Sequence, residues 1–484
     1  MRQRFVAAVI ALGGCAGAFA AYGAAAQTAP KPTSLKSTAQ QRTDVTITVY
    51  NQNFGLVREI RDIDLANGRV ALEFRDVSGQ IQPETVAIKS LLGATQLKVL
   101  EQNYRYDLLS PQKLLEKYVG KKVKVYRYNE KTGKEDEFEA EVLAVGDSPV
   151  LKINGEITFN FQGRFAFPEV PANLIAKPTL VWLLDSTAPK QKVEVTYLTR
   201  GMTWHSDYVF VINADDSGGD LTGWVTLTNQ TGATYAHAQL KLVAGDVQRV
   251  SDGRERGGYY PPAAPAATAT ASTGFREEGF FEYHLYTLQQ PTDLLENEQK
   301  QVTLLEAQGV VVKKRLMFFG QQHYYRGNYG QVTSNQKVGV YLDIENKENN
   351  HLGIPLPKGV VRVYKADRSG AKQFIGEDNI DHTPRDEKIR IKMGEAFDVV
   401  GDRKQTDYKV LGTCSSESGW EISLRNHKDT AQEVELSEPV GWDWEVTQSS
   451  SPAIKKDQRT LTFKVNVPAR GETKVTYRIR VKYC

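Results

Sequence analysis

The sequence predicts a mainly β protein built from tandem β-sandwich domains. Apolar and polar residues alternate along most of the chain, and a period of two places them on opposite faces of a strand. Polar segments rich in Gly, Asn and Pro separate these runs, as turns between strands require. The chain has 484 residues, more than one ordinary domain, and 40% of them are hydrophobic, enough for several cores.

The N-terminus resembles an export signal. Two arginines precede an uncharged apolar stretch, which ends in small residues before a polar, proline-containing run. We therefore expect residues 1–26 to be a cleaved signal peptide and residues 27–43 to be a polar linker, with no transmembrane helix after signal removal. The stretch "LGGC", ending at Cys15, also resembles a lipobox. A lipid anchor at Cys15 is the less favoured alternative, because the chain stays apolar beyond it.

Residues 44–185 predict an N-terminal β domain that carries a small insert at about 108–165. The insert begins with one amphipathic helix, in "LLSPQKLLEKYVGKK". Ser110 is placed to cap this helix, Pro111 suits its first turn, and Gly120 is placed to end it.

Short alternating strands follow the helix of the insert. Two of them flank Asn154-Gly155, a strong signal for a two-residue hairpin turn. A helix followed by about five short strands predicts a helix-plus-barrel insert of SH3- or Sm-like type.

Two further domains are predicted after the first. Residues 186–405 form a central β-sandwich, interrupted at 251–278 by a flexible loop rich in Gly, Pro, Ala and Thr. Residues 406–484 form an immunoglobulin-like sandwich, because strands such as 474–483 alternate strictly. The apolar positions of that last strand are Val475, Tyr477, Ile479, Val481 and Tyr483.

Cys414 and Cys484 remain if Cys15 leaves with the signal peptide. An even number of cysteines in an exported chain favours a disulfide, which would close a loop of about 70 residues and stabilise the fold by roughly 4 kcal/mol. The alternative is two free thiols.

His205 and Asp207 are a candidate polar pair in "TRGMTWHSDYVFVI". On a strand they share one face with Thr203, while Trp204 and Tyr208 point to the other face and into a core. A carboxylate beside an imidazole can orient a base or support a metal ion. No further ligand or activated nucleophile is signalled nearby, so we expect a polar outer face.

Tyrosine-rich loops are the best hint of a binding surface. Exposed tyrosines stack on sugars or anchor protein interfaces, and Tyr324, Tyr325 and Tyr329 in "HYYRGNYG" are the candidates. A role in core or loop packing is the favoured interpretation of these tyrosines. The acidic stretch 377–387 lacks the Asp/Asn ladder of a calcium loop, so we expect a turn there.

The sequence provides no catalytic, cofactor-binding or metal-ligating residues that we can assign. It has no G-x-S-x-G, H-E-x-x-H, phosphate-binding loop or CxxC motif. There are 61 Lys and Arg against 58 Asp and Glu, and loss of the two N-terminal arginines leaves 59 against 58. A nearly neutral chain gives no electrostatic reason to bind nucleic acid.

Several stretches resemble a family of exported bacterial proteins of unknown function that is related to the mucoidy-inhibitor-A-like proteins. They include "TYLTRGMTWHSDYVFVI" and "DLTGWVTLTNQTGATYAHAQLKLVAGDV". The most specific segments are 201–208 and 223–246, within a similarity that spans roughly 193–483. The resemblance implies a mostly β, multi-sandwich envelope protein and brings neither an established activity nor catalytic residues.

These observations favour an exported protein of the periplasm or outer envelope of a Gram-negative-type bacterium, or an outer-membrane lipoprotein as the alternative. We expect it to act without catalysis, by binding or scaffolding, with an envelope protein or glycan as partner. The alternative is a hydrolase of envelope polysaccharide or peptide, whose carboxylates only folding brings together.

Overall fold

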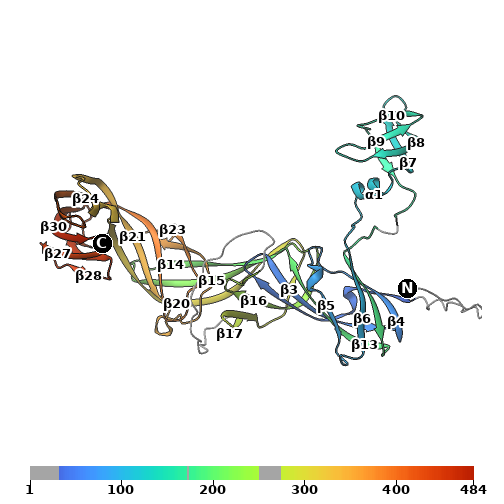
Figure 1. Cartoon of the computed structure of the whole chain (residues 1–484), viewed down its shortest axis with the longest axis horizontal. Coiled ribbons are helices and arrows are strands. Elements are labelled where there is room, and N and C mark those ends of the chain that lie inside the picture. Colours follow the sequence, from blue (N-terminus) through green and yellow to red (C-terminus); the bar gives the residue numbers. More distant parts are fainter. Residues whose placement is uncertain (1–31, 172–173, 250–273) are drawn as a thin grey trace, which may run out of the picture.

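The computed structural model describes residues 32–171, 174–249 and 274–484. The signal peptide predicted at 1–26 lies outside these residues, as does most of the loop predicted at 251–278. Strands dominate the described chain, which confirms the predicted mainly β fold of packed sheets. The molecule is elongated, and a small insert stands off one side, far from the C-terminus (Figure 1).

The N-terminal part is a sandwich of a four-stranded and an eight-stranded sheet. In the smaller sheet the order is β1 (Thr33–Ser37), β4 (Gly68–Arg75), β12 (Thr179–Ser186) and β6 (Leu97–Arg105). In the larger sheet it is β17 (Phe275–Phe280), β18 (Tyr283–Leu288), β16 (Tyr235–Ala244), β2 (Arg42–Tyr50), β3 (Phe54–Asp64), β13 (Lys190–Arg200) and β5 (Ala87–Ser90), with β19 (Thr292–Leu294) beside β16. Val57 on β3 and Trp182 on β12 lie in one core between the sheets.

Strand β1 corrects the expectation that residues 27–43 are a linker. It pairs in parallel with β4, Ser37 is fully buried, and Leu35 packs against the core. The short 3-10 helix η1 (Ala39–Gln41) then leads directly into β2. The stretch is polar and short, so only the hydrogen bonds from β4, which the sequence does not reveal, distinguish it from a linker.

The rest of the main body is a continuous system of thirteen strands. Its path is β23 (Lys372–Ile380), β22 (Gly359–Ala366), β14 (Met202–Ile212), β15 (Gly218–Asn229), β20 (Glu298–Phe319), β21 (Gln331–Glu345), β24 (Lys388–Gly412), β25 (Ser415–Asn426), β30 (Gly471–Lys482) and β27 (Asp443–Ser449). Off this path, β26 (Gln432–Pro439) joins β20 to β29 (Thr460–Val467), and β28 (Ile454–Lys455) pairs with β29. Three 3-10 helices complete the main body: η2 (Pro83–Thr85), η3 (Gln322–Arg326) and η4 (Glu348–Asn350).

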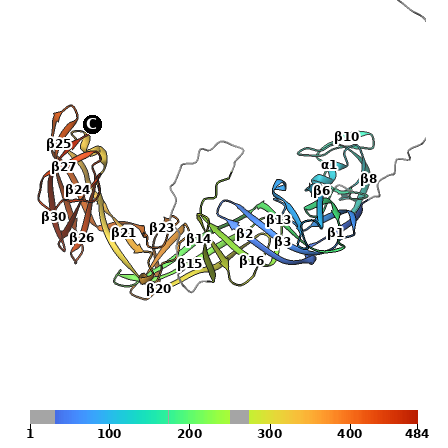
Figure 2. The same cartoon turned by 60° about the horizontal axis from the view of Figure 1, so that its bottom comes forward.

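Three long strands connect the C-terminal sandwich to the rest of the molecule. β20, β21 and β24 each contribute to two separate cores, as Val312 and Leu316 of β20 illustrate. Figure 2 shows the C-terminal strands gathered at one end, with β20 and β21 running from them toward the middle. Because these strands are continuous, the two sandwiches are joined by sheet and not by a linker.

Neither predicted domain boundary coincides with a gap between cores. The first, between residues 185 and 186, falls before the last residue of β12, and β12 and the following β13 face the same core. The second, between 405 and 406, lies within β24. A long alternating strand has the same pattern on both sides of such a junction, so periodicity alone does not locate it.

The insert folds around a core of its own. Helix α1 (Pro111–Lys117) precedes a five-stranded antiparallel sheet, and Ser110 caps the helix by accepting a hydrogen bond from the backbone of Lys113. The order is β10 (Glu156–Thr158), β9 (Val150–Ile153), β8 (Lys134–Ala144), β7 (Lys122–Asn129) and β11 (Arg164–Ala166).

The insert sheet does not close into the predicted barrel. A barrel closes only when its two edge strands hydrogen-bond with each other. Within the described residues, β10 pairs only with β9 and β11 only with β7, and each is three residues long. The predicted hairpin turn is present, since Asn154 and Gly155 both have positive φ, of 51° and 88°.

Candidate functional site

A groove of about 1510 Å³ lies at the base of the insert. Its walls are the segment 36–45, the end of β4 at 73–79, the chain returning from the insert at 174–179, and the turn at 232–237. The groove therefore lies where the N-terminal sandwich meets the two segments that carry the insert. We call it the stalk groove.

The charges in the stalk groove largely neutralise one another. Arg75 lies 2.7 Å from Glu73, and Lys177 lies 2.6 Å from Asp76. Burial acts to raise the pKa of Asp76, but hydrogen bonds from Lys177 and from the backbone of Ala39 hold it below its usual range. Asp76 is thus a fixed acceptor and not a proton donor.

Arg42 links the stalk groove to a buried cluster of charged and phenolic side chains. Its Nε donates to Glu59 Oε2 at 2.7 Å, and the Nη2 of Arg61 lies 3.2 Å from both carboxylate oxygens of Glu59. Glu59 and Arg61 are fully buried. The guanidinium of Arg61 also lies 3.5 Å from the ring centroid of Phe74, a cation–π contact.

Two fully buried tyrosines, Tyr197 and Tyr235, complete this cluster, which we call the Arg42 cluster. Its members come from four adjacent strands, in the order β16, β2, β3 and β13. Burial, followed by the proximity of Tyr235 and Glu59, raises the pKa of Tyr197 well above its usual value. Burial likewise raises the pKa of Tyr235 to about 12.

A second cluster of the same residue types lies in the C-terminal sandwich. Arg403 and Glu438 form a fully buried ion pair, and Tyr325 donates a hydrogen bond to Glu438 at 2.8 Å. The hydroxyl of Tyr325 is also 2.8 Å from that of Tyr477. We call this the Arg403 cluster.

The structure buries two of the three tyrosines that were candidates for a binding loop. Tyr324 and Tyr325 lie in η3 and are buried against Trp420, with ring centroids 6.1 Å and 5.5 Å from it. Of the three candidate tyrosines only Tyr329 is exposed, at 46%. The reason is that a buried ion pair needs hydrogen-bond donors, and Tyr325 supplies one.

His205 and Asp207 lie together on strand β14, where the imidazole faces solvent and the carboxylate is mostly covered. His205 Nε2 is 3.1 Å from Asp207 Oδ2, and the imidazole side chain is 54% exposed. Asp207 also accepts hydrogen bonds from Arg362 at 2.8 Å and Thr226 at 3.0 Å. Burial acts to raise the pKa of Asp207, but these two bonds and His205 lower it. The pair belongs to a row of polar contacts across the sheet.

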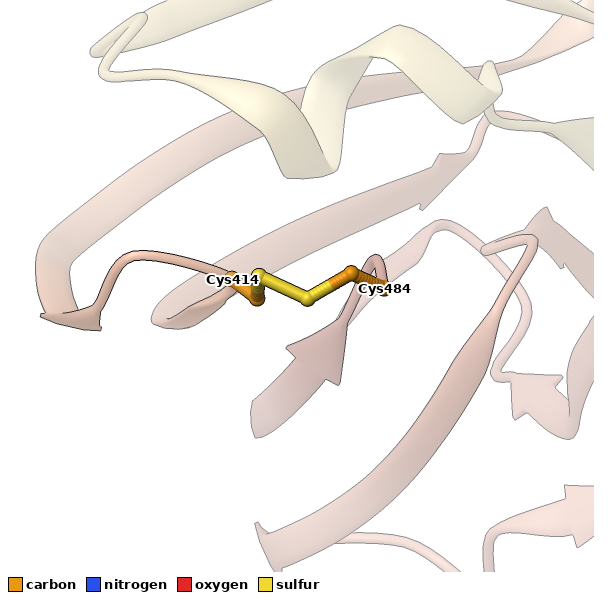
Figure 3. The surroundings of a disulfide bond; sticks show 2 residues. All are labelled: Cys414 and Cys484. Carbon is orange, nitrogen blue, oxygen red and sulfur yellow. A yellow bond between two sulfur atoms is a disulfide. The ribbon is translucent and has the colours of Figure 1, made fainter.

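The two cysteines form a disulfide at the end of the C-terminal sandwich. Cys414 lies in the turn between β24 and β25, and Cys484 follows β30, which pairs with β25 (Figure 3). Their Cα atoms are 5.6 Å apart. The bond therefore ties the last residue of the chain to the sheet.

The insert exposes apolar side chains along its outer edge strand. Ile157 on β10 is 67% exposed, and Phe159, just after it, is 68% exposed. We call these two residues the insert edge. β10 lies at the end of the insert farthest from the main body (Figure 1).

Sequence reasoning missed the Arg42 cluster, although a signal for it exists. Val57, Glu59, Arg61 and Ile63 alternate with exposed or half-buried neighbours on β3, so two opposite charges occupy inward positions of an apolar face. Charged residues are almost never fully buried unless they are paired.

Within the described ranges, no group of His, Cys, Asp and Glu is arranged to hold a metal ion, and no helix is long and apolar enough to cross a membrane. No protein-family model matches the sequence, and no curated protein matches it significantly.

Proposed function

We propose that the protein is an exported component of the bacterial cell envelope that binds another envelope protein through the insert edge and does not catalyse a reaction. The export signal predicted at the N-terminus, and the resemblance to exported proteins of unknown function, support the location. The main body acts as a rigid support, because β20, β21 and β24 run through both of its sandwiches.

The observation that carries this proposal is the construction of the insert. It has its own core, and the backbone of Leu109 bonds to Ile175 where the two connecting segments run side by side. Its outermost strand, β10, pairs on one side only within the described residues and carries the exposed Ile157, with the exposed Phe159 directly after it. An unpaired apolar strand edge is a template for another strand.

The chemistry of the insert edge favours a polypeptide over a glycan. An extended peptide satisfies the free N–H and C=O groups of β10 in a regular ladder, while its side chains cover Ile157 and Phe159. A glycan has no such ladder of alternating donors and acceptors. Detection of a glycan bound at the insert edge would therefore contradict a polypeptide partner.

The stalk groove does not favour the alternative of a hydrolase. A glycosidase needs one carboxylic acid with a raised pKa and a second carboxylate across the bond. Asp76 has a lowered pKa, and Glu73 is held by two arginines, Arg75 at 2.7 Å and Arg105 at 3.4 Å. Asp76 and Glu73 are therefore not arranged as the two catalytic carboxyl groups of a glycosidase.

Site-specific photo-crosslinking in living cells tests the proposal. A photo-reactive phenylalanine at position 159 should give one dominant adduct that mass spectrometry identifies as a polypeptide. The matched control is the same group at Tyr128, which is 64% exposed on β7 of the same insert. Equal adducts at both positions, or an adduct removed by glycosidase treatment, would contradict a protein partner at the insert edge.

A further inference from the structure

The Arg42 cluster contains more positive than negative charge. Arg42 and Arg61 share one carboxylate, that of Glu59. Asp76 also interacts with Arg61, but its carboxylate is bound by the exposed Lys177. Arginine stays protonated in proteins, so the buried cluster carries one uncompensated positive charge.

Two guanidinium donors of the cluster, Arg42 Nη2 and Arg61 Nη1, have no acceptor among the described residues, and both atoms are buried. The hydroxyl of Tyr235 interacts with those of Tyr197 and Thr231. A buried donor without an acceptor loses its hydration without replacement, and a buried unpaired charge costs more still. The cluster thus lacks both acceptors and negative charge.

The tyrosines do not supply the missing charge. Burial raises the pKa of Tyr197 well above its usual value and that of Tyr235 to about 12, so both remain neutral phenols at physiological pH. A buried water would offer acceptors but no charge. An anion would offer both.

The Arg403 cluster is a natural control for this reasoning. It has one arginine and one carboxylate, and both of its tyrosine hydroxyls are hydrogen-bonded. The same residue types in the same kind of sandwich therefore form a balanced cluster when the charges are equal. Arg403 Nε also lacks a partner among the described residues, so the feature that distinguishes the Arg42 cluster is its excess of positive charge.

From this difference we propose that the Arg42 cluster binds a small monovalent inorganic anion of the chloride type. Arg42 lines the stalk groove and pairs with Glu59, so the cluster lies directly beneath this groove. The anion accepts hydrogen bonds from the two guanidinium groups and balances the excess charge. It is a structural ligand, and the inference does not depend on the proposed function.

Crystals of the mature protein grown in bromide test the site directly. An anomalous bromide peak is expected between Arg42, Arg61 and the two tyrosines. The absence of a peak there, with peaks only at surface sites, would overturn the proposal.

A melting experiment tests the same site in solution. At constant ionic strength, the melting temperature should rise as chloride replaces gluconate, which is too large to enter, because a ligand of the native state stabilises it. Arg42→Met balances the cluster and should abolish the chloride response. The matched variant Arg403→Met should lower the melting temperature and leave the response intact. The proposal would be contradicted if Arg42→Met kept the chloride response, or if the melting temperature of the wild type were the same in chloride and in gluconate.

Discussion

Replacement of Glu438 by glutamine should severely destabilise the C-terminal sandwich. The substitution keeps the shape of the side chain but removes the only carboxylate bonded to Arg403, which is fully buried. Removing one partner of a buried ion pair costs about 3–5 kcal/mol, because the remaining charge is left uncompensated. Since glutamine still accepts a hydrogen bond from Tyr325, we expect a loss of about 3 kcal/mol, at the lower end of that range.

Urea unfolding followed by tryptophan fluorescence measures this loss. Trp420 packs on Tyr325, with ring centroids 5.5 Å apart, so its environment reports on the cluster. The double variant Arg403→Met, Glu438→Leu removes both charges and should be markedly more stable than the sum of the single variants predicts. A loss below about 1 kcal/mol for Glu438→Gln, the size of an exposed ion pair, would refute the reasoning. The reasoning would also be refuted if the stability loss of the double variant equalled the sum of the losses of the two single variants.

Three further predictions address other parts of the molecule. Replacing Cys414 and Cys484 by serine should lower the free energy of unfolding by roughly 4 kcal/mol in the chain-entropy model, as chemical denaturation will show. Burial acts to raise the pKa of Asp343, but Arg390 and Arg315 hold this pKa below its usual value. The stability that the ionised carboxylate contributes is therefore present above about pH 4, and it is lost as the pH falls through the folded-state pKa. Asp343→Asn should therefore lower the melting temperature at pH 7, and the difference from the wild type should vanish in acid. His205→Ala should change stability by less than about 0.5 kcal/mol, because the imidazole is exposed, and a loss of function with an intact fold would revive a catalytic role.

Local signals in the sequence predict the elements of this fold well. Ser110 and Pro111 identify the start of the single α-helix in the described chain, and Asn154-Gly155 identifies a hairpin turn. The reason is that caps and tight turns depend on residues within a few positions of each other.

Contacts between distant segments are where sequence reasoning falls short. The parallel pairing of β1 with β4, and the passage of β24 from one core to another, depend on partners far along the chain. Tyr325 looks like a loop residue until Glu438, more than a hundred residues later, is placed beside it. Propensity and periodicity carry no information on such partners.

The most direct test of the account is the affinity of the insert edge for its cross-linked partner. The dissociation constant of the purified partner should rise at least about tenfold, or 1.4 kcal/mol, for Ile157→Ser with Phe159→Ser. The melting temperature and the affinity of the Tyr128→Ser control should match those of the wild type. Unchanged binding by the doubly substituted edge would contradict the claim that this protein acts by presenting its insert to another protein.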